Sequence, residues 1–239
     1  LSGLAWEPVF VDFFGGEGRS PEFRAKNIMG EVPLLEDGDI RLTFAEAYSA
    51  ATCVAEGLIE THGLQKGDRV GIAARNSANW MIAYMGIIMA GGCATLLNGW
   101  WQGPELAEGI DAVGATLVLA DAQRAARLAD VGYSGGAHIL GLDISAELEK
   151  ALAPVLGDAD LSDVTLPEIT GDDLATILFT SGSTGQSKGA FSTHRAVVQG
   201  TFNYIAQALV VLQLATEDGT VSVDRPQHAA LLTVPLFHV

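Results

Sequence analysis

Short apolar runs alternate with helix-length segments in this sequence, and the alternation limits the fold more than any other feature. The runs 69–74, 93–97 and 116–120 have the length and apolar content of buried strands. Ser77 can cap a helix after the first run, and Pro104 stands in the first turn of a helix after the second. This order predicts parallel βαβ units with helices on both faces of the sheet. The predicted fold class is therefore α/β, a layered domain with a largely parallel sheet.

The helix that precedes the first of these strands has the clearest start signal. Thr43 and Glu46 have the spacing of a capping box, in which each side chain satisfies a backbone amide at the helix start. Gly63 can end the same helix in a left-handed turn. Between these limits the apolar residues recur at helical spacing. They are Phe44, Ala47, Tyr48, Ala51, Val54 and Leu58.

The character of the chain changes in the segment 141–173. Acidic residues outnumber basic ones nine to one there, and hydrophobic periodicity is weak after its midpoint. We interpret it as an exposed acidic connection, a solvated loop rather than an interaction site, with a short helix near 146–152. Order returns with a predicted strand at 174–179, and another is predicted at 229–234. A helix face between them is formed by Val198, Phe202, Ile205, Leu209 and Leu212.

Length and charge limit the function. The 239 residues suffice for one large α/β domain or two small ones. With 13 basic and 29 acidic residues, the net charge of −16 argues against nonspecific binding to nucleic acid or to anionic lipid, which both require a positive surface. An anionic ligand would therefore need a local site rich in hydrogen-bond donors.

The cysteines and histidines give no metal or disulfide signature. Cys53 and Cys93 belong to no Cys-x-x-Cys pair, and the five histidines have no close ligand spacing. We therefore expect neither a disulfide framework nor a zinc site, and we expect a reducing, cytoplasmic location.

The uncharged stretch around 80–97 is long enough to cross a bilayer. Gly91 and Gly92 divide it into a helix-length and a strand-length piece, and no lysine or arginine cluster flanks it. We therefore predict no transmembrane segment. The chain begins without methionine or a signal peptide and ends on the apolar run "TVPLFHV", from which we expect a fragment cut at its C-terminal end.

The stretch "LFTSGSTGQSKG", 178–189, has the composition of a phosphate-binding loop. Glycines bring backbone amides close to a ligand, hydroxyls add neutral donors and the lysine adds one positive charge. The alternative is a flexible surface loop. The composition of the loop, its lysine and the strand before it all favour phosphate binding. The candidate nucleotide-binding residues are Thr180, Ser181, Gly182, Ser183, Thr184, Gly185 and Lys188.

This loop does not match two common nucleotide-binding patterns. Counting the triphosphatase pattern from Gly182 puts Ser187 where a second glycine is needed and Gly189 where a Mg²⁺-binding hydroxyl is needed. No G-x-G-x-x-G follows a strand, so a dinucleotide fold has little support.

The stretch does resemble the phosphate loop of the adenylate-forming, or AMP-binding, superfamily, whose pattern is near T-S-G-[ST]-T-G-x-P-K-G. That superfamily includes acyl- and aryl-CoA synthetases, firefly luciferase and peptide-synthetase adenylation domains. Ser187 replaces the usual proline, which we expect to loosen the loop. The resemblance extends over nearly the whole chain, and "LLNGWWQGPEL" and "VPLFHV" are similar to the acyl-CoA synthetase versions of their segments.

The resemblance implies an acid–thiol ligase that uses ATP, Mg²⁺ and coenzyme A. A carboxylate, predicted to be a fatty acid, would displace pyrophosphate from ATP to give acyl-AMP, and a thiol would then displace AMP. The loop residues named above would hold the β- and γ-phosphates. His238 would lie near the acyl pocket as a substrate-binding residue, although a half-buried structural role is the alternative. Trp100 and Trp101 could edge a channel, but plain packing is the stronger expectation.

The family also needs parts that would follow Val239: an adenine-binding segment with a Mg²⁺-binding glutamate, an aspartate for the ribose and a lid with a catalytic lysine. Residues 1–239 would then be the N-terminal part of the large domain, with no catalytic residue of their own and no activity alone. We expect exposed apolar surface near 229–239 and self-association of the chain. His194, at a helix start, is interpreted as a neutral packing residue because the helix dipole disfavours a cation there.

Three alternatives remain open. The domain could load a carrier protein instead of coenzyme A. It could be a nucleotide-binding module that has lost catalysis. It could also be an unrelated phosphate-binding protein, which would show no preference for ATP together with an acid.

Overall fold

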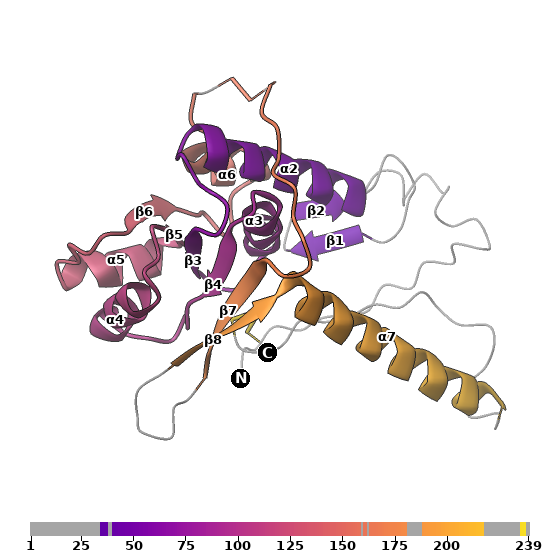
Figure 1. The fold of residues 1–239 in the computed structure, drawn as a ribbon. Coiled ribbons are helices and arrows are strands. Elements are labelled where there is room, and N and C mark those ends of the chain that lie inside the picture. The colour runs from indigo at the N-terminus through magenta and orange to yellow at the C-terminus, as the bar shows by residue number, and fades with distance from the viewer. Residues whose placement is uncertain are drawn as a thin grey trace.

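The computed structural model describes residues 34–37, 40–158, 160–161, 163–180, 188–217 and 235–237. Its centre is a six-stranded sheet with the strand order β6-β5-β3-β4-β7-β8 (Figure 1). The first five strands are parallel, and β8 pairs antiparallel with β7. The strands are β3 (Arg69–Ala73), β4 (Cys93–Leu96), β5 (Leu117–Ala120), β6 (His138–Gly141), β7 (Leu174–Thr180) and β8 (Lys188–Thr193). The predicted α/β fold with a largely parallel sheet is confirmed.

Four of the predicted strands are present, each within one or two residues of the expected bounds. The strand predicted at 229–234 lies outside the described residues. The structure adds β6 and β8, and a separate antiparallel pair formed by β1 (Leu34–Asp37) and β2 (Ile40–Thr43). Sequence reasoning missed β8 because its residues are small or polar apart from Phe191, and none of them is buried, so no buried face marks this edge strand.

Helices cover both faces of the sheet, as predicted (Figure 1). On one face, α2 (Phe44–Glu60), α3 (Ala78–Met89) and α6 (Leu148–Leu156) share a hydrophobic core with the strands. On the other face, α4 (Gly103–Val113) and α5 (Ala122–Asp130) form a second core. Side chains alternate between the two cores along each strand, so Ile72 joins the first and Ala73 the second.

The capping box that begins α2 is confirmed. The Thr43 hydroxyl accepts a hydrogen bond from the Glu46 amide at 3.2 Å, and the Thr43 amide donates to the Glu46 carboxylate at 2.7 Å. Gly63 ends the turn after the helix with a φ of 66°, the left-handed conformation predicted for it. The apolar positions predicted for α2 are not equally buried. Val54 and Leu58 are buried, whereas Phe44 and Tyr48 are exposed.

The segment 141–173 is not a wholly exposed connection. Its helix is α6, displaced towards the C-terminus from the predicted 146–152. Ala151, Leu152 and Val155 are buried, and Leu152 and Val155 belong to the core that α6 shares with α2. The predicted short helix is therefore present, but the interpretation of the segment as solvated was wrong for α6, because the apolar face of this amphipathic helix packs on the core.

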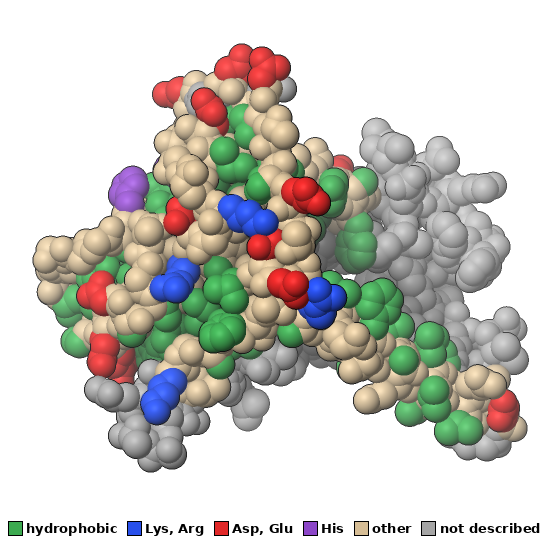
Figure 2. Space-filling model, in the orientation of Figure 1, with side chains coloured by type: hydrophobic (Ala, Val, Ile, Leu, Met, Phe, Trp, Pro, Cys, Tyr) green, Lys and Arg blue, Asp and Glu red, His purple; other side chains and the backbone are tan. Residues whose placement is uncertain are grey.

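The last described helix, α7 (His194–Glu217), has no buried residue in the described structure. Figure 2 shows hydrophobic side chains along it on the visible face of the molecule. Within the described ranges, α7 is the one helix that is long and apolar enough to cross a membrane by length and composition. However, Gln199, Asn203, Gln207 and Gln213 place amide side chains along its length, and a surface that packs on protein is the better physical account.

Hydrogen bonds to the Asp173 carboxylate fix the start of β7. They predict how the stability of the fold depends on pH in acid. A hydrogen bond from Lys66, with Nζ–Oδ2 at 2.8 Å, and then one from the Thr170 amide lower the pKa of Asp173 from 3.8 to about 2. Such a carboxylate stabilises the fold above its unfolded pKa and loses that contribution as the pH falls through its folded pKa. We therefore expect Lys66→Met to reduce the loss of stability between about pH 4 and about pH 2.

Urea unfolding midpoints across this pH range measure the effect. Lys150→Met, which removes another positive charge on the surface, is the matched control and should follow the unmodified chain. If the urea midpoints of Lys66→Met and of the unmodified chain fell equally with pH, the contact between Lys66 and Asp173 would not contribute to the loss of stability in acid.

Candidate functional site

The candidate phosphate loop joins two antiparallel strands. Thr180 ends β7, Lys188 begins β8, and the two residues are paired in the sheet. The Thr180 hydroxyl lies 3.4 Å from the Lys188 carbonyl oxygen, to which it donates. Both residues are exposed and therefore accessible to a ligand. Ser181, Gly182, Ser183, Thr184 and Gly185 lie outside the described residues.

This arrangement corrects one prediction. The sequence indicated a strand, a loop and then a helix, but β8 separates the loop from α7, which begins at His194. The amino end of the helix is therefore not at the loop, and its dipole is not directed at a phosphate held there. Loop amides, hydroxyls and the Lys188 ammonium are the groups left to bind an anion.

The loop starts at the carboxyl edge of the parallel sheet, where open α/β folds bind ligands. At the same edge, the adjacent strands β3 and β5 lead into helices on opposite faces of the sheet, α3 and α5. Such a reversal creates a crevice outside the strand ends. The segments that follow β3, β4 and β5 therefore form the part of the site nearest the crevice.

A buried ion pair joins these segments. Asp121 and Arg124 are 3% and 5% exposed, and their side chains meet at 2.9 Å. Asp121 also accepts hydrogen bonds from the amides of Arg75 and Arg124, which fixes the end of β3 and caps α5. Burial lowers the pKa of Arg124, and the adjacent Asp121 charge opposes that shift. The pair thus holds the ends of β3 and β5 together.

The segment after β4 is bound by the same arginine. Arg124 Nε donates to the Gly99 carbonyl oxygen at 2.9 Å, and its Nη2 donates to the same atom. Arg127 Nη1 reaches both the Gly99 and Trp101 carbonyl oxygens, at 3.1 and 2.7 Å. Sequence reasoning did not identify these arginines as site residues. An aspartate directly after a predicted strand was the available signal, since it marks the cap of a further helix.

The two tryptophans lie on this fixed segment and contact different parts of the edge. Trp101 packs edge-on against Phe179 of β7, with ring centroids 4.9 Å apart. Trp100 packs edge-on against Phe237 at 5.4 Å, yet remains 64% exposed. The expected packing role is therefore confirmed for Trp101. Much of the Trp100 ring is instead exposed to solvent at the carboxyl edge of the sheet.

Residues 235–237 lie over the same edge. The Leu236 amide donates to Asn76 Oδ1 at 2.8 Å, which fixes the segment to the loop after β3. Phe237 is buried, contrary to the exposed apolar surface predicted for this part of the chain. His238 lies outside the described residues.

His194 is placed as the sequence predicted, in the first turn of α7. Its amide donates to the Asp173 carbonyl oxygen at 3.0 Å. Burial lowers the pKa of its imidazole, and the Asp173 charge partly opposes that shift. The neutral form is therefore favoured.

Both cysteines are free thiols, and Cys93 is buried in β4. Burial raises the pKa of Cys93 to about 11, so its thiol stays protonated near neutral pH. No group of three or more histidine, cysteine or acidic side chains in the described ranges could hold a metal ion.

Comparison with known proteins agrees with this geometry. A profile of the family described as AMP-binding enzyme matches residues 22–239. The chain is 28% identical over 202 residues to 4-coumarate–CoA ligase 3 from Arabidopsis thaliana, covering 82% of this chain and 33% of that protein. It is 30% identical over 196 residues to 3-[(3aS,4S,7aS)-7a-methyl-1,5-dioxo-octahydro-1H-inden-4-yl]propanoyl:CoA ligase from Rhodococcus jostii, covering 73% and 37%.

A solved structure shares the fold. The crystal structure of ATP-bound MatB from Rhodopseudomonas palustris matches with a TM-score of 0.60 and 29% identity, over 70% of this chain and 32% of that one. The chain thus spans about a third of the length of the relatives that it matches.

Proposed function

We propose that this chain, which belongs to the AMP-binding enzyme family, takes part in the ATP-dependent joining of a carboxylic acid to coenzyme A. The observation that carries the proposal is the paired position of Thr180 and Lys188 at the carboxyl edge of a parallel sheet. A glycine- and hydroxyl-rich loop between them supplies donors for a polyphosphate. The names of the relatives, which are CoA ligases, support the second half of the reaction.

In the proposed reaction, a carboxylate oxygen attacks the α-phosphorus of ATP. The bond from that phosphorus to the β-phosphate oxygen breaks, and pyrophosphate leaves with the bond electrons. The sulfur of coenzyme A then attacks the acyl carbon of acyl-AMP, AMP leaves and the thiol proton is released. Charge develops on the departing phosphates in the first step, so donors already aimed at them lower the barrier.

The residues of this chain have distinct parts in that step. Lys188 supplies a positive charge at one end of the loop, and Thr180 supplies a hydroxyl at the other. The Asp121–Arg124 pair positions the segment that carries Trp100 and Trp101 beside β7. The described residues offer no set of ligands for Mg²⁺, so we derive no step through that ion and treat it as part of the nucleotide substrate.

The identity of the acid stays a prediction. The resemblance predicts a fatty acid, but the two ligases compared above carry names with 4-coumarate, an aromatic acid, and a polycyclic propanoate. Trp100, exposed beside Phe237, provides an aromatic surface at the edge that would suit either an aromatic ring or an acyl chain.

The test is carboxylate-dependent ATP–pyrophosphate exchange by the full gene product, over acids from acetate to long-chain and aromatic. Exchange with one class of acid supports adenylation and identifies that class. A thiol panel of coenzyme A and a phosphopantetheinylated carrier protein then separates the two acceptors. A protein that binds ATP but exchanges with no acid would instead be a binding module that has lost catalysis. Residues 1–239 alone are expected to show no turnover.

We also propose self-association of this chain through α7. Val198, Phe202, Ile205 and Leu209 leave between 46% and 64% of their surface exposed along one helix, and a second copy could bury these side chains. Light scattering is expected to give a mass above the 25.0 kDa of one chain. The double variant Phe202→Glu with Leu209→Glu should restore the single-chain mass, whereas Gln207→Glu, which adds charge at a polar position, should not. A single-chain mass for the unmodified chain would contradict the proposal.

A further inference from the structure

A cavity of about 330 Å³ lies at the opposite edge of the sheet from the candidate phosphate loop. Its walls include Asp68 and Thr116, which directly precede β3 and β5, and His138, which begins β6. Parallel strands begin at this amino edge, whereas the ligand crevice of such folds is at the carboxyl edge. The proposed ligase chemistry therefore gives this cavity no role.

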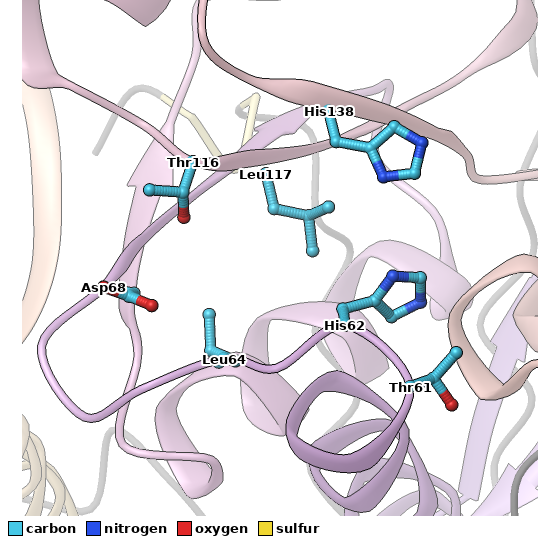
Figure 3. Close-up of a pocket in the computed structure, with 7 residues that line it drawn as sticks. All are labelled: Thr61, His62, Leu64, Asp68, Thr116, Leu117 and His138. Carbon is cyan, nitrogen blue, oxygen red and sulfur yellow. The ribbon is translucent and has the colours of Figure 1, made fainter.

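Two histidines face each other in the cavity. The ring centroids of His62 and His138 are 6.3 Å apart, with the ring planes inclined by 51°. Figure 3 shows both imidazoles on the same side of the cavity, each with a ring nitrogen on the edge turned towards the other. Two zinc–nitrogen bonds of about 2.0–2.1 Å at a tetrahedral angle place the ring centroids about 5 Å apart. The observed rings are about 1 Å further apart than that, and a turn of the exposed His138 ring towards His62 brings both nitrogens onto one ion.

The second nitrogen of His62 is already occupied. His62 Nε2 lies 3.0 Å from the Val155 carbonyl oxygen at the end of α6. A carbonyl oxygen can only accept, so Nε2 carries the proton and Nδ1 keeps a free lone pair. Metal-binding histidines are commonly fixed in this way, with the other ring N–H donated to a carbonyl oxygen.

The backbone on both sides is fixed before any ligand arrives. The turn that carries His62 is closed by Gly63 and tied to α6 by a 2.7 Å hydrogen bond from the Thr61 hydroxyl to the Leu156 carbonyl oxygen. His138 donates its amide to the Thr116 carbonyl oxygen at 3.0 Å and pairs with Leu117 in the sheet. A metal ion would therefore lose little to ordering of the backbone.

We propose that His62 and His138 form a binding site for a divalent transition-metal ion such as Zn²⁺. The two imidazoles supply the protein ligands, and water completes the coordination. Nitrogen ligands favour such ions over Mg²⁺ or Ca²⁺, which bind oxygen. The Asp68 carboxylate lies across the cavity and accepts a hydrogen bond from the Gln65 amide at 2.9 Å, so its part is to add negative charge, in a chain whose net charge is −16. The site is independent of the proposed ligase activity.

Isothermal titration of the chain with ZnCl₂ in a non-chelating buffer tests the proposal. One ion per chain is expected, and MgCl₂ should give no signal. His62→Gln and His138→Gln should each weaken Zn²⁺ binding at least tenfold. Thr116→Val, a variant of similar shape in the same cavity wall, should bind as the unmodified chain does. Circular dichroism of each variant, with its thermal midpoint, checks that folding is retained.

A second readout tests the geometry. In NMR spectra of the imidazole nitrogens, addition of Zn²⁺ should change the chemical shift of His62 Nδ1, while Nε2 should stay protonated. Zn²⁺ should also raise the thermal midpoint of the unmodified chain but not that of either histidine variant. Absence of Zn²⁺ binding, binding that survives either histidine substitution, or coordination through His62 Nε2 would each overturn the proposal.

Discussion

Replacement of Arg124 by methionine is expected to lower the free energy of unfolding by about 3–5 kcal/mol. The substitution leaves the Asp121 carboxylate, 3% exposed, without its cationic partner. It also removes two donors from the Gly99 carbonyl oxygen. Removal of one member of a buried pair is costly because the remaining charge stays desolvated.

Urea unfolding of the two chains measures this difference, provided that the slopes agree. Ala126→Met, at an exposed position on the same helix, is the control and should stay within about 0.5 kcal/mol. A loss below about 1 kcal/mol for Arg124→Met would mean that water replaces the arginine and that the pair does not hold the carboxyl edge together.

Replacement of Lys188 by alanine is expected to reduce kcat/KM for ATP–pyrophosphate exchange by the full gene product about 10²–10³-fold. The reason is that the ammonium group would neutralise charge that develops on the departing phosphates. This effect follows from the proposed function. Since Lys188 is exposed at the start of an edge strand, folding should be little affected, and the thermal midpoint checks this.

Two further variants sharpen the result. Lys188→Arg keeps the charge but changes its geometry, so it should recover part of the lost activity. Ser192→Ala lies on the same strand and should stay within about threefold of the unmodified protein. If Lys188→Ala retained activity within about threefold, the lysine would not contact the phosphates and the loop assignment would fail.

Much of the sheet could be predicted because its strands are locally marked. The runs at β3, β4 and β5 are apolar apart from Arg69 and Thr95, since both of their faces are covered by helices. The start of α2 is set by two residues three positions apart, Thr43 and Glu46, so the sequence is enough to locate it.

Other elements lack such a local signal. In α5 only Arg124 and Leu128 are buried, and in β8 no residue is buried, so neither element shows a clear hydrophobic period. The helix α6 lies in an acidic segment whose composition resembles a loop, although Val155 is fully buried. Tertiary packing decides these elements.

The candidate site divides in the same way. The motif around Thr180 and Lys188 is contiguous, because a loop that surrounds a phosphate must use consecutive amides, and its residue types could be read directly from the sequence. Whether that loop leads into a helix or a strand depends on pairing between β7 and β8, which is a contact between strands.

The sequence by itself determined the alternation of strands and helices, the cap of α2 and the residue types of the phosphate loop, because each depends on neighbours within a few positions. The tertiary structure alone decided that Asp121 and Arg124 hold Gly99, and that His62 faces His138. Gly99 follows β4 whereas Asp121 and Arg124 begin α5, and His62 follows α2 whereas His138 begins β6, so no local pattern specifies these contacts. They meet because parallel strands align their equivalent ends, which gathers distant segments at the two edges of one sheet.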